Sequence, residues 1–169
     1  MISERAAGRI RPYLDALEKK VTALFQHSEA VKEQFAENSF ERYMGLRNMV
    51  AECKGLMILI EERLNKAEEE GEDVTELRQQ LALLTTQFWE TLLSTALYFF
   101  RQISNTPQLP LGSRDVFVRE LQTLHDARHL LNRPPYSEQV SDSTLQNLDT
   151  AERILQEIIE RAPGLLELE

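Results

Sequence analysis

Two histidines four residues apart, His125 and His129, are the side chains best spaced for metal chemistry. On a helix this spacing places both imidazoles on one face, so both can bind the same metal ion. A closed site needs three or four protein ligands, and Glu90 is the carboxylate that a facing helix would supply. The sequence therefore admits a metal-dependent helical enzyme that uses these three residues. Two surface histidines are the simpler interpretation, because no third ligand lies nearby in the sequence, and we expect no metal and no cofactor.

A second candidate is a row of carboxylates at every fourth residue, formed by Glu29, Glu33, Glu37 and Glu41. Enzymes built on helical bundles hold divalent metals with carboxylates of this kind. No Glu-x-x-His pair accompanies the row, however, and the row lies away from the apolar positions of its segment. An exposed acidic face is the favoured interpretation, because unpaired carboxylates are seldom buried.

Two further motifs have simple structural explanations. The densest charge run, Glu68–Asp73, surrounds Gly71 and favours a solvated turn between two helices over contact with a basic partner. It also lacks the alternating oxygen ligands of a calcium loop. Pro134-Pro135-Tyr136 is a fragment of a proline-rich docking peptide. We interpret it as a rigid loop, because proline ends helices as readily as it recruits partners.

The spacing of apolar residues predicts that the elements carrying these side chains are helices. Spacings of three and four alternate through four heptads at Tyr43, Leu46, Val50, Cys53, Met57, Ile60, Leu64 and Ala67. The preceding stretch keeps this spacing, with Ser28 at one apolar position, through Ile10, Leu14, Leu17, Val21, Leu24, Val31 and Phe35. Such spacing is typical of helices that pack along other helices. Gly45 and Gly55 each cost a helix about 1 kcal/mol relative to alanine, so we expect them at close helix contacts.

Capping residues and helix breakers predict five helices, at about residues 12–37, 39–70, 73–105, 113–131 and 142–162. Pro12 suits a first turn, so residues 2–10 are expected to form a leading helical turn or a kinked extension of the first helix. Gly71 suits the left-handed position past a helix end. Asp73 and Glu76 suit a capping box at the start of the third helix. Short turns make the three long helices antiparallel neighbours. We therefore predict an all-α antiparallel bundle, one domain over residues 1–169, in which two shorter C-terminal helices complete the fourth side.

The apolar spacing changes past Phe88, where the stripe continues with two consecutive spacings of four. A slip of this kind locally unwinds a coiled coil, so this half of the helix should meet more than one neighbour. Leu97, Tyr98, Phe99 and Phe100 place apolar side chains on several faces there. These four residues are the predicted interaction surface, buried either within the chain or against a partner.

Composition excludes several function classes. With 169 residues, 42% of them hydrophobic, the chain can bury the core of one domain. Its net charge of −9 argues against nucleic-acid binding, and the local basic excess is limited to Arg5, Arg9 and Arg11. Residues 79–100 form the most apolar stretch, but Glu90 and several polar side chains dilute it. We therefore expect no membrane span.

Cys53 is the single cysteine of the chain, and its heptad position predicts a buried thiol without a disulfide. Together with the lack of an apolar signal segment in residues 1–11, it predicts a cytoplasmic location. The sequence favours a non-enzymatic helical bundle that acts in protein–protein interaction, as an adaptor, chaperone-like or regulatory protein. We expect the partner to be another protein or a second copy, as in a homodimer, bound through helices. The alternative remains the metal-dependent enzyme with His125 and His129.

Overall fold

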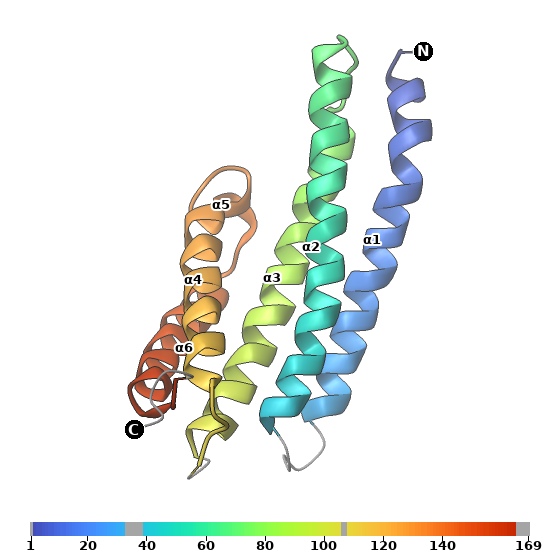
Figure 1. Ribbon diagram of the computed structural model, residues 1–169. Helices are drawn as coiled ribbons and strands as arrows, with labels where there is room; N and C mark the ends of the chain where they lie inside the picture. Colours follow the sequence, from blue (N-terminus) through green and yellow to red (C-terminus); the bar gives the residue numbers. More distant parts are fainter. Residues whose placement is uncertain (1, 33–38, 106–107, 165–169) are drawn as a thin grey trace.

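The computed structural model describes residues 2–32, 39–105 and 108–164, with side chains over 5–30, 44–105 and 108–164. These residues form six helices and no strand (Figure 1). The helices are α1 (Ile2–Lys32), α2 (Ser39–Glu69), α3 (Thr75–Ser104), α4 (Ser113–Leu131), α5 (Tyr136–Gln139) and α6 (Asp142–Arg161). The predicted all-α helical bundle is confirmed.

Helices α1, α2 and α3 form a group in which consecutive helices run antiparallel and each helix contacts the other two (Figure 1). The heptad positions make these contacts: Leu14 and Leu24 of α1, Leu46 and Ile60 of α2, and Phe88 of α3 are fully buried. Each of these side chains contributes about 1.5–3 kcal/mol through the removal of its apolar surface from water. The apolar heptad residues predicted from the sequence therefore form the core between α1, α2 and α3.

Helix α3 is shared with a second group of helices. α6 packs along α3 on the side away from α1, and α4 packs against α6 (Figure 1). Between Phe88 and Ile103, Arg101 is the only exposed residue of α3. Phe100 meets Phe117 of α4 edge to face, with ring centroids 6.4 Å apart. Past Phe88, α3 thus has neighbours on several sides, as the slip in spacing predicts.

The turn between α2 and α3 depends on Gly71, whose φ of +84° is the predicted left-handed conformation. Its N–H donates to the Glu68 carbonyl at 3.0 Å, and the Glu72 N–H donates to the Ala67 carbonyl, also at 3.0 Å. These bonds satisfy carbonyl groups that the end of a helix would otherwise leave without donors.

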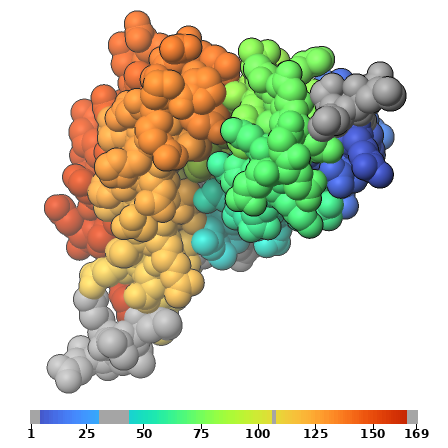
Figure 2. Space-filling view, turned by 90° about the horizontal axis from the view of Figure 1, so that it is seen from above, coloured from blue at the N-terminus to red at the C-terminus, as the bar shows by residue number. Residues whose placement is uncertain are grey.

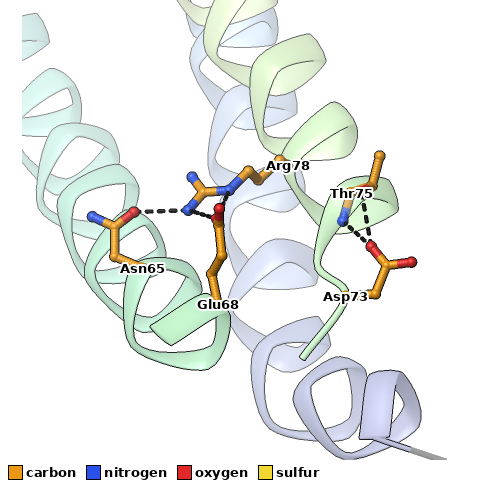
Figure 3. A network of polar contacts seen from close by, with 5 residues as sticks. All are labelled: Asn65, Glu68, Asp73, Thr75 and Arg78. Carbon is orange, nitrogen blue, oxygen red and sulfur yellow. Dashed lines mark hydrogen bonds and ion pairs between the residues drawn. The ribbon is translucent and has the colours of Figure 1, made fainter. Parts of the chain in front are cut away.

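Helix α3 begins at Thr75, two residues after the predicted start at Asp73. Asp73 Oδ1 accepts from the Thr75 N–H at 3.1 Å and from the Thr75 hydroxyl at 2.8 Å (Figure 3). Both bonds favour the charged carboxylate and lower the pKa of Asp73. Glu76 lies 3.7 Å from Arg11 instead of over the helix start, so the predicted capping box does not form.

Helix α1 begins at Ile2 and contains Pro12 in its interior, so residues 2–10, expected as a leading turn or a kinked extension, belong to the same helix as the segment predicted from residue 12. Proline removes one helical hydrogen bond, but the extra turns bury Ala6 and Ile10 in the core. Arg9 adds an ion pair to the nearly buried Glu72, with Nη2 and Oε2 3.1 Å apart. Tertiary contacts therefore outweigh the local signal of Pro12. The predicted end of this helix, at Glu37, lies outside the described residues.

Gly45 and Gly55 do not lie at close helix contacts. A Cβ atom built on either residue meets nothing within 4 Å, and both residues are exposed on α2. The expectation that they permit close approach of two helices is wrong, because they lie outside the heptad stripe that faces α1 and α3.

The C-terminal helices follow the sequence signals closely. α4 has the predicted bounds, and α6 begins after Ser141, whose hydroxyl accepts from the Thr144 N–H at 3.1 Å. The one-turn helix α5 was not predicted, and the Pro134–Pro135 peptide bond before it is cis. None of the helices in the described part of the chain is long and apolar enough to cross a membrane.

Candidate functional site

Two cavities each take lining residues from α2, α3 and α4 and share none of them. We call the surface made by the two cavities and the α2 face that joins them the α2–α4 groove. The first cavity has a volume of about 300 Å³, and its lining includes Met44, Arg47, Ala51, Lys54, Leu92 and Glu120. The second has about 440 Å³, and its lining includes Glu61, Arg78, Leu81, Leu130, Arg133 and Tyr136. Figure 2 shows the molecule from above, with the segment around α5 in orange beside the end of α2 and the start of α3 in green. Both volumes are in the range of cavities that bind ligands.

The α2 wall of the groove is one face of the helix. Spacings of three and four join its members: Met44, Arg47, Ala51, Lys54, Ile58 and Glu61. On this face of α2, Ile58 lies between Lys54, which lines the first cavity, and Glu61, which lines the second. The exposed fraction of Ile58 is 60%. An apolar side chain this exposed is accessible to a ligand or partner.

An ion pair between Arg47 and Glu120 joins α2 to α4 at the first cavity. Only 12% of the Glu120 side chain is exposed, against 32% for Arg47. A carboxylate so deeply buried needs a cation beside it, because desolvation of an unpaired charge costs several kcal/mol. This pair therefore fixes the spacing of the two walls.

Lys54 and Trp89 form the polar contact in the middle of the groove. The Lys54 ammonium lies 5.4 Å from the centre of the Trp89 ring, which is within the range of a cation–π interaction. Trp89 is 4% exposed, and its Nε1 is buried without a hydrogen-bond partner among the described residues. Because Lys54 has no carboxylate partner in this part of the structure, its charge is available to a ligand in the first cavity.

The second cavity combines apolar and charged groups. Arg78 forms an ion pair with Glu68 and a hydrogen bond to Asn65. Its Nη2 lies 2.7 Å from Glu68 Oε2 and 2.8 Å from Asn65 Oδ1 (Figure 3). Glu61 and Arg133 form no ion pair within the described residues. Burial, with a smaller contribution from Glu61, raises the pKa of Tyr136.

The structure does not bring the predicted metal ligands together. His125 and His129 are exposed on α4, whereas Glu90 lines a cavity beside Phe25 and Ser28 of α1. Across the described residues, no group of three or more His, Cys, Asp or Glu side chains is placed to hold a metal ion. The metal-dependent enzyme thus gains no support from the placement of these side chains.

The predicted aromatic surface is mostly covered within the chain. Leu97, Phe99 and Phe100 are buried, and Tyr98 is half-buried beside a cavity that reaches Asn147 of α6. Tyr98 is therefore the member of this set that a partner can reach without displacing a helix. Its role in an interaction stays a prediction.

The other charged motifs lie at the surface or outside the described side chains. Glu29 is exposed, but the side chains of Glu33, Glu37 and Glu41 are outside the described set, so the row as a whole is not seen. In the run Glu68–Asp73, only Glu72 is buried, paired with Arg9. Pro134 and Pro135 are exposed at the rim of the second cavity.

The α2–α4 groove was missed in the sequence, although one signal for it is present. Met44, Ala51 and Ile58 recur every seven residues on a face of α2 outside the main heptad stripe. A second apolar repeat on one helix indicates a second packing surface. Residues of α3 and α4 complete the groove, and their placement follows from the packing of α6, which the spacing within one helix does not encode.

Comparison with models of protein families, with curated proteins and with solved structures found no match.

Proposed function

We propose that this protein is a non-enzymatic interaction module that binds an amphipathic helix of a partner protein in the α2–α4 groove. The observation that carries this proposal is the groove itself, with Leu92 in its lining and the exposed Ile58 on the same face of α2 as Lys54 and Glu61. A helix laid between α2 and α4 would cover Ile58 and would pack as a further member of the bundle. Adaptor, chaperone-like and regulatory roles all use such a surface.

A partner protein suits the groove better than a second copy of the chain. The large apolar side chains exposed in the described residues are Phe25, Ile58, Leu83 and Val118, each on a different helix, and Leu111 in the loop before α4. A helix that docks in a groove needs several anchors on one face, at spacings of three, four and seven. Within the described residues no helix offers such a stripe, so a homodimer is the less favoured occupant. The single cysteine, Cys53, is buried without a disulfide, which supports the cytoplasm as the proposed compartment.

A stapled helical peptide tests this function. The peptide carries leucines on one face and only alanine and glutamine elsewhere, and a fluorescein label reports binding through anisotropy. We expect saturable binding to the wild-type chain. Ala51→Arg places a long charged side chain on the groove wall and should weaken binding by about tenfold or more.

The matched control is Ala23→Arg, the same change at an exposed alanine of α1 outside the groove. It should bind the peptide as the wild type does. Equal loss of binding in both variants, or no binding to the wild type, would overturn the proposal. Sedimentation that shows a concentration-dependent dimer, lost in Ala51→Arg and kept in Ala23→Arg, would replace the partner helix with a second copy.

A further inference from the structure

The charges on the α2–α4 groove differ in sign from the charge of the whole chain. The net charge of the chain is −9. In the lining of the first cavity, however, Arg47 and Lys54 face one carboxylate, Glu120. In the second cavity, Arg78 and Arg133 face one carboxylate, Glu61. The lining of each cavity thus has one more cation than anion, although Glu68, outside the lining, pairs with Arg78 and balances the charge of the second cavity.

Only some of these charges are available to a partner. Arg47 is paired with Glu120, and Arg78 is paired with Glu68. The cations without an ion pair in the described residues are Lys54 on the α2 wall and Arg133 after the end of α4. They lie on opposite sides of the groove, one in each cavity.

We propose that the helix bound in the α2–α4 groove carries carboxylates on both edges of its apolar face, one facing Lys54 and the other facing Arg133. This inference rests on the proposed function and specifies its partner. The apolar face of that helix covers Leu92 and Ile58, and its edges supply the anions that the two free cations lack. Complementary charges at the rim of an interface select the partner and its orientation more than they add affinity.

The net charge of the chain makes this proposal testable, because an acidic peptide is repelled by the molecule as a whole. Three stapled peptides share the same leucine stripe. The first has glutamates on both edges of the stripe, the second has the same glutamates on the face opposite the stripe, and the third has glutamine throughout. Each competes with the labelled glutamine peptide for the wild-type chain.

We expect the edge-glutamate peptide to bind roughly three- to tenfold more tightly than the glutamine peptide, and the opposite-face peptide to bind more weakly. Lys54→Glu should abolish the advantage of the edge-glutamate peptide over the glutamine peptide. Lys19→Glu, at an exposed lysine of α1, is the matched control and should leave the advantage intact. Glu61→Gln should increase it, because the one free anion of the groove is removed.

The two proposals fail in different ways. If all three peptides bind equally, or if Lys54→Glu and Lys19→Glu have the same effect, the acidic partner is wrong while the groove remains a helix site. If the glutamine peptide does not bind, the proposed function itself is wrong, and the acidic partner is rejected with it.

Discussion

The hydroxyl groups of Ser28 and Thr95 pair inside the contact between α1 and α3, where each residue is 1% exposed. Thr95 donates its single hydroxyl hydrogen to the Thr91 carbonyl at 2.7 Å. Ser28 must therefore be the donor in the pair, and Thr95 the acceptor. The polar residue at an apolar heptad position is thus satisfied by the facing helix.

This assignment predicts unequal effects of two substitutions. Thr95→Val leaves the Ser28 hydrogen buried without an acceptor and should lower the free energy of unfolding by about 1–3 kcal/mol. Ser28→Ala leaves Thr95 with its bond to Thr91 and should cost less than about 1 kcal/mol. The double variant should recover most of the loss caused by Thr95→Val. Urea unfolding measures all three, and equal losses for the two single variants would contradict the assigned donor.

Cys53 predicts how stability responds to alkaline pH. Burial raises the pKa of its thiol from 9.0 to about 11 in the folded chain. Between these values the unfolded chain loses the proton while the folded chain keeps it. The unfolded state then binds fewer protons, so the free energy of unfolding falls as pH rises from 9 to 11.

The check is the slope of unfolding free energy against pH in this range, for the wild type and for Cys53→Ala. The variant should have a shallower slope. A residual slope is expected in the variant, because the pKa values of Lys20 and Tyr136 are also raised in the folded state. An unchanged slope would show that the Cys53 thiol titrates alike in both states.

At the scale of the helices, replacing Gly55 or Gly71 by alanine should change the stability of the fold in opposite directions. Gly55 lies within α2, and Gly71 lies just past its end. Gly55 is exposed in the helix interior, and an added Cβ meets nothing within 4 Å, so Gly55→Ala should stabilise the fold by about 1 kcal/mol. Gly71 also has free space around it, but its φ is +84°. Gly71→Ala should therefore destabilise the fold by about 1–2 kcal/mol. Thermal unfolding decides this, and a shift of the same sign in both variants would contradict the account.

The sequence predicts the helices well where one apolar stripe decides which face is buried. The predicted heptad positions between Ile10 and Leu24 and between Leu46 and Ala67 are nearly all buried. The change in apolar spacing past Phe88 marks the part of α3 that contacts both groups of helices. The continuity of α1 through Pro12 is less well predicted, because burial of Ala6 and Ile10 in the core outweighs the local effect of the proline.

The candidate site was harder to predict than the core. The α2 wall has a weak signal in Met44, Ala51 and Ile58, but the groove exists because α4 is held opposite α2. That placement depends on the packing of α4 on α6 and of α6 on α3, together with the ion pair between Arg47 and Glu120. Contacts between residues so far apart in the chain are not visible in the spacing within a helix.

At the scale of the whole molecule, α3 is shared by two groups of helices (Figure 1). The α2–α4 groove is lined by residues of both groups. The walls belong to different groups, which meet at the pair of Arg47 and Glu120. A partner helix in the groove would tie the two groups together. We therefore expect the bound peptide to raise the melting temperature of the wild type, and to leave that of Ala51→Arg unchanged.

The most direct test of the groove as a helix site uses Trp89, the only tryptophan of the chain, which lies beneath Lys54. The leucine–glutamine peptide is prepared with a dansyl group at its midpoint as an energy acceptor, and Trp89 emission is recorded during titration. We predict that the emission falls in step with binding in the wild type and in Ala23→Arg, and that it does not fall in Ala51→Arg. A peptide that binds to saturation while the Trp89 emission stays constant would contradict the central claim, because it would be bound elsewhere.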